Sequence, residues 1–197
     1  FIVPAATAPN EVVVNGMSPS KRNNKFANSG IVVEINVHQD LPKYEKFGIF
    51  KGLQFQKDVE QLAFVAGGKN LQAPAQRLTD FVEGRLSNTL NDTSYQPGIK
   101  SAPLHSILPK LIGQKLRKAF KAYGQKMPGF YTELANIIAV ESRTSAPVKI
   151  PRTQDLHHLK ITNLYPGGEG AGYAGGIVSA AMDGEQIAEA LVKQLNK

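Results

Sequence analysis

A glycine-rich segment lies near the carboxyl end of the chain, Tyr165-Pro166-Gly167-Gly168-Glu169-Gly170-Ala171-Gly172-Tyr173-Ala174-Gly175-Gly176, and the interpretation of the whole sequence depends on it. Seven of the 18 glycines fall between Tyr165 and Gly184. Glycine allows positive φ angles and lets another group come close to the backbone. A helical pattern follows, so the N–H groups of the segment would lie at the positive end of a helix. This arrangement predicts a seat for a phosphate or another electron-rich group.

The residues Gly170-Ala171-Gly172-Tyr173-Ala174-Gly175 also match the dinucleotide-binding pattern G-x-G-x-x-G. That motif requires a helix, a second strand and an acidic residue about 20 positions further on. Only 22 residues follow Gly175, and the predicted helix uses most of them. No second strand fits, so we reject the dinucleotide interpretation of these glycines.

The segment fits a different role better. In many flavoproteins a carboxyl-terminal segment closes over FAD. In those proteins a strand ends in a turn of small residues, and in this chain that strand would be Ile161–Tyr165. An acid, here Glu169, hydrogen-bonds the ribityl chain, and a helix begins at Gly176-Ile177 near the pyrimidine edge of the flavin. The helix dipole would stabilise the negative charge of reduced flavin. A tight turn between strand and helix, without any ligand, is the alternative.

Hydrophobic periodicity predicts an α+β fold. Short strands are expected at both ends of the chain and helices in the middle, with a Pro/Gly/Ser/Asn-rich loop over 87–103. We predict that 1–38 and 135–197 form the carboxyl-terminal part of a cofactor-binding domain. Residues 39–134 would form a mostly helical insertion, or cap, on the substrate side. The predicted strands are 11–16, 31–37, 136–141 and 160–165, and the predicted helices are 56–66, 74–82, 111–123 and 177–195.

The amino-acid composition excludes several kinds of site. The 197 residues include no cysteine, which excludes disulfides, thiolate metal sites and cysteine nucleophiles. His157 and His158 are adjacent and would point apart, so we predict no metal site. No apolar run approaches the roughly 20 residues that span a bilayer. We therefore expect no membrane partner and a cytoplasmic location.

The formal net charge of +7 favours anionic partners. The basic helix expected around Lys110–Lys126 raises a second hypothesis, a module that binds nucleic acid. Its aromatic residues, Phe120 and Tyr123, share the apolar face and would pack in the core. They would then offer no stacking platform for bases, so nucleic acid is the less favoured partner.

Three stretches closely resemble a bacterial family of uncharacterised FAD-dependent dehydrogenases. The most specific runs from Leu164 to Gly184, and the next is Glu141-Ser142-Arg143-Thr144-Ser145-Ala146-Pro147-Val148. The opening, with Val14–Ser18 and Phe26–Ile31, is also similar. The resemblance implies that a nucleotide-binding Rossmann half precedes these residues. The chain, which starts at Phe1 without Met, would then be a carboxyl-terminal portion that lacks the site for the ADP half of FAD.

The resemblance also implies which residues meet the cofactor. Gly168, Glu169 and Gly170 would contact the ribityl–phosphate region. Gly175, Gly176 and Ile177 would face the pyrimidine edge, and Arg143, Thr144 and Ser145 would approach the flavin or substrate pocket. Hydride or electron transfer would pass through flavin N5, with NAD(P)H a candidate partner and a small molecule as substrate. The family supplies no defined substrate and no proven catalytic residue, so we assign none.

Overall fold

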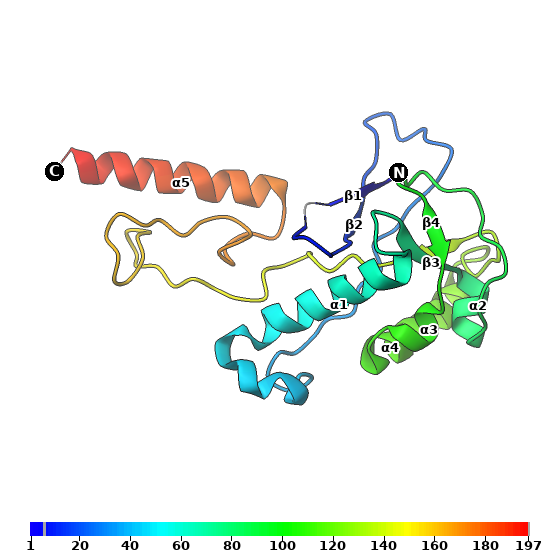
Figure 1. The fold of residues 1–197 in the computed structure, drawn as a ribbon. Coiled ribbons are helices and arrows are strands. Elements are labelled where there is room, and N and C mark those ends of the chain that lie inside the picture. The colour runs from blue at the N-terminus through cyan, green and yellow to red at the C-terminus, as the bar shows by residue number, and fades with distance from the viewer. Residues whose placement is uncertain (6, 197) are drawn as a thin grey trace. The chain divides into compact units, whose positions relative to one another are not determined.

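The computed structural model describes residues 1–5 and 7–196. The chain folds into two compact units, and each unit is made of two separate stretches of sequence (Figure 1). Unit 1 consists of Phe1–Asn36 and Gln56–Ser142, and unit 2 consists of Val37–Phe55 and Arg143–Lys197. The candidate cofactor residues named above all belong to unit 2.

The sheet of unit 1 is built around β3 (Ala73–Arg77). This strand pairs in parallel with β4 (Ile99–Ser101) and antiparallel with β5 (Asn136–Ile138). Both neighbours meet β3 at Ala75, which faces Ser101 on one side and Ile138 on the other. The first four residues of β3 are buried, as expected for a central strand.

Helices complete the core of unit 1. α2 (Leu78–Glu83) follows β3 directly and stops at Gly84, which adopts a left-handed conformation with φ 77°. Its Phe81 is fully buried and meets Phe120 of α4 (Lys110–Lys126) edge to face, with ring centroids 6.0 Å apart. Such aromatic pairs add to the apolar area that the two rings bury. The short α3 (Leu104–Ile107) and the longer α1 (Lys51–Gly67) complete the helices whose residues contribute to this unit.

The start of the chain packs into the same unit. β1 (Ile2–Pro4) pairs antiparallel with β2 (Val14–Gly16), and Val12 and Val13 before β2 are buried. The Val14 N–H donates to the Val140 carbonyl oxygen over 2.9 Å. The hairpin is therefore tied to the chain that follows β5.

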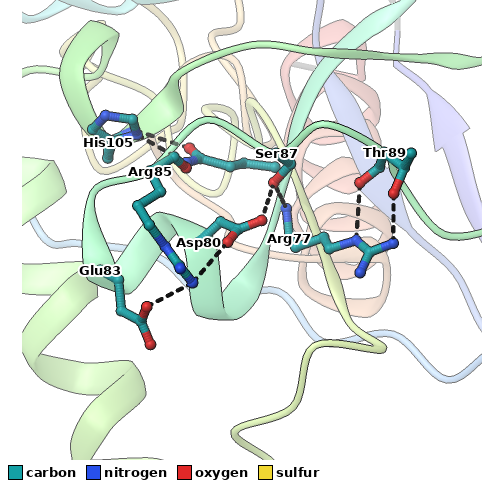
Figure 2. A network of polar contacts seen from close by, with 8 residues as sticks. Arg77, Asp80, Glu83, Arg85, Ser87, Thr89 and His105 are labelled. Atoms are coloured by element: carbon teal, nitrogen blue, oxygen red, sulfur yellow. Dashed lines mark hydrogen bonds and ion pairs between the residues drawn. The ribbon is translucent and has the colours of Figure 1, made fainter.

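A buried polar network fixes the loop after α2 (Figure 2). Ser87 is 2% exposed; its Oγ accepts the Arg77 N–H and donates to Asp80 Oδ2, both over 2.8 Å. Gln76, fully buried, contacts the Arg85 carbonyl oxygen and His105 Nδ1 through its amide nitrogen. Burial, together with the nearby Arg117 charge, lowers the pKa of His105. These polar groups satisfy one another, and the network serves to hold the loop on β3.

Unit 2 contains the nine-residue 3₁₀ segment η1 (Pro42–Phe50), kinked at Gly48 where φ is 54°, and the long helix α5 (Ile177–Leu195). A single antiparallel bridge joins Arg152 to His158. Most of the remaining residues of this unit are irregular. Within the described residues, no helix combines the length and the apolar character needed to cross a membrane.

The predicted α+β class is confirmed by five helices and two small sheets in the described chain. The helices predicted over 56–66, 111–123 and 177–195 are confirmed as α1, α4 and α5. The assignment of 39–134 to a helical insertion, and of 1–38 with 135–197 to a cofactor-binding domain, stays a prediction.

Five predicted elements are wrong in whole or in part. Residues 74–77 belong to β3 rather than to a helix, and the helix begins only at Leu78. Neither 31–37 nor 160–165 forms a strand in the described chain. The His158 N–H donates to the Leu164 carbonyl oxygen over 2.7 Å, but this bond does not extend into a ladder of strand pairing. The strands predicted over 11–16 and 136–141 exist but are shorter, as β2 and β5.

Candidate functional site

The glycine-rich segment of unit 2 forms a compact series of turns. The Gly172 N–H donates to the Glu169 carbonyl oxygen, and the Tyr173 N–H donates to the Gly168 carbonyl oxygen, each over 3.0 Å. Gly168 and Gly172 have φ angles of 66° and 83°, which favour glycine. The turns thus follow from glycines at the two positions where the backbone is left-handed.

The glycines of this segment fall into two groups. A Cβ added to Gly167 would overlap Ile187 of α5, and one added to Gly172 would lie 3.1 Å from the Val148 carbonyl oxygen. Gly167 and Gly172 therefore pack against other residues of unit 2. A Cβ added to Gly170, Gly175 or Gly176 would meet no atom within 4 Å. At these three positions the backbone is open to an approaching group.

A buried ion pair connects the segment to α5. Arg152 Nη2 lies 2.6 Å from Asp183 Oδ1, and Nη1 lies 3.1 Å from Oδ2. The two side chains are only 10% and 8% exposed. The same carboxylate accepts the Gly168 N–H over 2.8 Å, while Arg152 Nη1 donates to the Pro166 carbonyl oxygen over 2.9 Å. The Arg152 guanidinium, followed by the Gly168 N–H, holds the pKa of Asp183 below its usual value, and Asp183 raises the pKa of Arg152.

Tyr173 packs against two cations. The Arg152 guanidinium carbon lies 3.7 Å from the Tyr173 ring centroid, and Lys149 Nζ lies 4.5 Å from it. Both distances are within the range of cation–π attraction. The Tyr173 hydroxyl donates to the Ile150 carbonyl oxygen over 3.0 Å. The far end of the glycine-rich turns is therefore attached to the stretch around Ile150.

The first turn of α5 offers free backbone donors. Its N-cap is Gly176, which has no side chain to cap the helix. The Gly176 carbonyl oxygen accepts the Ala180 N–H over 2.9 Å and the Ser179 hydroxyl over 3.0 Å, and Ser179 Oγ accepts the Gly175 N–H over 3.3 Å. The N–H groups of the first turn of any helix have no partner within that helix. Ile177 and Val178 are 90% and 72% exposed. Donors at a positive helix end, beside open glycine backbone, suit an anionic or electron-rich group.

The structure shows where the nine predicted residues lie. Glu169 is half-buried, and Arg143, Thr144 and Ser145 are exposed where the second stretch of unit 2 begins. The glycines Gly168, Gly170, Gly175 and Gly176, with Ile177, lie in the turns and at the start of α5. No residue of this group is known to touch a ligand, so their roles stay predictions.

Sequence reasoning missed Arg152 and Asp183, which organise the segment. They stand 31 positions apart, and neither belongs to a local motif. A partial signal was available in the sequence, because Asp183 falls on the same helix face as the apolar Ala180, Ile187 and Leu191.

Other site types find no support in the described residues. Among them, no three His, Asp or Glu side chains come together as a metal site. Unit 1 carries an open groove of about 680 Å³ between α1 and the β4–α3 region. Its walls are mainly apolar, with Leu62, Val65 and Ile107, and Asp58 is among its polar residues.

Comparison with known proteins identifies the family. Residues 1–144 match the family described as "FAD-dependent protein, C-terminal domain-like". The chain belongs to this family. The family match ends two residues after Ser142, the last residue of unit 1, and the glycine-rich segment lies beyond it.

A relative from Clostridium beijerinckii, described as an uncharacterized protein, covers both units of this FAD-dependent family member. It is 36% identical over an alignment of 197 positions that covers 99% of this chain. The chain spans 36% of the length of that relative.

Proposed function

We propose that the chain is the carboxyl-terminal portion of a longer FAD-dependent oxidoreductase, and that its glycine-rich segment and the start of α5 contact the flavin. The observation that carries the proposal is the open backbone at Gly170, Gly175 and Gly176 beside the free donors of α5, in a member of an FAD-dependent family. FAD has both phosphates and an electron-rich flavin edge, so this donor set fits it.

Each predicted residue then has a definite task. Gly175, Gly176 and Ile177 would face the pyrimidine edge of the flavin, where the helix dipole favours negative charge. The Gly176 and Ile177 N–H groups would be the donors, because the Gly175 N–H already donates to Ser179 Oγ over 3.3 Å. Glu169, next to the open Gly170, would accept hydrogen bonds from ribityl hydroxyls. Bound FAD would supply hydride or electron transfer, and the residues of this chain would orient it and shield it from water.

Arg143, Thr144 and Ser145 are proposed to line the flavin or substrate pocket. All three residues are exposed. The substrate is a small molecule, with NAD(P)H as a candidate electron donor. The open apolar groove of unit 1 supports a role for residues 39–134 on the substrate side.

The nucleic-acid hypothesis receives less support. Phe120 of α4 is buried and packs against Phe81, while Tyr123 packs against Phe130 with ring centroids 5.4 Å apart. Binding of single strands relies on aromatic side chains that bases can reach. The lysines on the opposite side of α4 are therefore better explained as a solvated face.

The test uses the longer protein and compares Glu169→Ala with Glu185→Ala. Glu185 is an exposed acid on α5 outside the glycine-rich segment, so its loss controls for the change in charge. We expect the parent protein to be purified yellow, with flavin absorbance. A hydrogen bond to a charged group contributes about 1.5–3 kcal/mol, so Glu169→Ala should weaken FAD binding about 10-fold or more.

Two results would overturn the proposal. One is a longer protein that stays colourless after incubation with FAD but shifts RNA in a salt-dependent manner. The other is an equal FAD affinity in Glu169→Ala and Glu185→Ala, which would refute the ribityl role of Glu169.

A further inference from the structure

We infer that Arg152 and Asp183 are the positioning pair of the glycine-rich segment, which hold residues 166–173 in their ligand-ready shape before any cofactor binds. The inference rests on the proposed function only for the identity of the ligand. The pair itself, its burial and its contacts are features of unit 2 alone.

The contacts of the pair converge on the first glycine turn. Asp183 accepts the Gly168 N–H, and Arg152 donates to the Pro166 carbonyl oxygen. The turn is thus held at two backbone positions separated by a single residue, Gly167. A Cβ on that residue would overlap the terminal methyl group of Ile187 and lie 3.3 Å from Asp183 Oδ2, so a larger residue would require the Ile187 side chain to move. The ion pair therefore determines where the turn lies against α5.

The second turn is held by the same arginine through Tyr173. The guanidinium lies over the Tyr173 ring, and the Tyr173 N–H closes the turn on the Gly168 carbonyl oxygen. Arg152 consequently touches both the beginning and the end of the stretch 166–173. A lysine at this position would keep the charge but lose the planar fork that reaches two carboxylate oxygens and a carbonyl together.

Burial separates this pair from the ion pairs of the surface. The Asp183 and Arg152 side chains are almost completely buried, whereas the Lys25–Asp92 pair has side chains 74% and 84% exposed. A buried ion pair gains little net stability over apolar residues, but removing one partner leaves an uncompensated charge. The main contribution of the Arg152–Asp183 pair is therefore the geometry that it imposes on the backbone.

The pair divides the segment into a fixed part and an open part. Residues 166–173 are tied to α5 and to Ile150 at both ends, although Gly170 within them is open to an approaching group. Gly175 and Gly176 also face open space, and Gly175 is bonded to α5 through its N–H and Ser179 Oγ. A ligand that docks on the open part then has few residues to order, and binding loses less conformational entropy. Arg152 and Asp183 would act on FAD affinity through this preorganisation and without touching the cofactor.

Hydrogen exchange on the 197-residue chain, without FAD, tests the positioning role directly. We compare the parent with Asp183→Asn, which keeps the size of the side chain and removes its charge, and with Glu185→Gln as the matched control on α5. The Gly168, Gly172 and Tyr173 amides should exchange at least 10-fold faster in Asp183→Asn than in the parent. In Glu185→Gln their exchange rates should equal those of the parent. Amides of α4 serve as the reference for an intact unit 1.

Arg152→Lys is the second variant. It tests the positioning role if α5 unfolds in Asp183→Asn, which would make exchange in that variant uninformative about the turns. Lysine keeps the charge of Arg152 but lacks its planar fork. We therefore expect residues 166–173 to exchange faster in Arg152→Lys while α5 stays helical. Unchanged exchange of this stretch in both variants would overturn the inference.

FAD binding to the longer protein separates this inference from the proposed function. Asp183→Asn should raise the dissociation constant for FAD about 10-fold while Glu185→Gln leaves it unchanged. A longer protein that never binds FAD, combined with faster exchange in Asp183→Asn, would refute the proposed flavin role and support the positioning pair. Unaltered FAD affinity in Asp183→Asn, despite faster exchange, would overturn the link between preorganisation and cofactor binding.

Discussion

Replacing Gly172 by alanine should destabilise the glycine-rich turns, whereas the same change at Gly170, two residues away, should not. Gly172 has φ 83°, and its added Cβ would lie 3.1 Å from the Val148 carbonyl oxygen and 3.2 Å from Lys149 Cα. Both neighbours are backbone atoms, which cannot rotate away. Gly170 has no atom within 4 Å of its added Cβ.

The magnitude follows from two costs at Gly172. An alanine held at a left-handed φ loses about 1 kcal/mol relative to glycine. Pushing neighbouring backbone aside by a few tenths of an ångström costs about 2 kcal/mol, by analogy with overpacked cores. Together they predict a local destabilisation of about 3 kcal/mol, which corresponds to about a 100-fold change in the opening equilibrium. At Gly170 the change should stay within about 0.5 kcal/mol.

The readout is exchange of the Tyr173 amide, which donates to the Gly168 carbonyl oxygen across these turns. Local exchange is preferable to a melting curve, because a chain with two compact units need not unfold in one step. Gly172→Ala should accelerate this amide about 100-fold, and Gly170→Ala should leave it within about threefold. Equal rates in the two variants would refute the idea that these glycines have separate tasks.

Two further predictions concern the core and pH. Phe81→Ala should destabilise unit 1 by about 3–5 kcal/mol in urea unfolding followed by circular dichroism, because the ring is fully buried against Phe120; Phe50→Ala, at a 55% exposed position, is the control and should change little. The pKa of Asp183 is lower in the folded chain than the roughly 3.9 of an unfolded aspartate, so the ion pair with Arg152 stabilises unit 2 above that pH and loses its effect as the pH falls through the folded value. The protection of α5 amides, corrected for the intrinsic pH dependence of exchange, should begin to fall in the parent protein below about pH 4. A similar fall in Asp183→Asn would contradict it.

Helices with a strong 3.6-residue period were predictable from sequence. In α4 the buried Leu116 and Phe120 share one face, and exposed lysines occupy the other, so the pattern alone located the helix. The start of α5 was also predictable, because Gly175 and Gly176 end the preceding loop and a regular apolar pattern begins at Ile177.

Strand β3 could not be predicted, because its residues do not favour a strand locally. Ala73, Ala75 and Gln76 have weak strand preference, and alanine favours helices. Pairing with β4 and β5 on both sides overrides that preference. The opposite error occurred over 31–37, where exposure does alternate along the chain as predicted. Alternation reports which side chains face inward, but a strand also requires a ladder of backbone hydrogen bonds with a second strand, and 31–37 belongs to neither sheet of the described chain.

At the candidate site the sequence located the glycines but not what holds them. The cluster at 167–176 stands out because glycine has a direct meaning for the backbone. The sequence pattern did not separate inward-facing Gly167 and Gly172 from open Gly175 and Gly176, since that depends on Ile187 and Val148. The Arg152–Asp183 pair depends on a tertiary contact, which spacing along the chain does not encode.

The two units interleave along the chain, and this determines the order in which they can form during synthesis. β3 obtains one of its two neighbours from Asn136–Ile138, so the sheet of unit 1 closes only after those residues have left the ribosome. Unit 2 begins with Val37–Phe55 but needs Arg143–Lys197 to finish. The glycine-rich segment therefore takes shape after the sheet of unit 1, and a nascent chain that has reached only Ser142 carries that whole sheet but nothing of the candidate site.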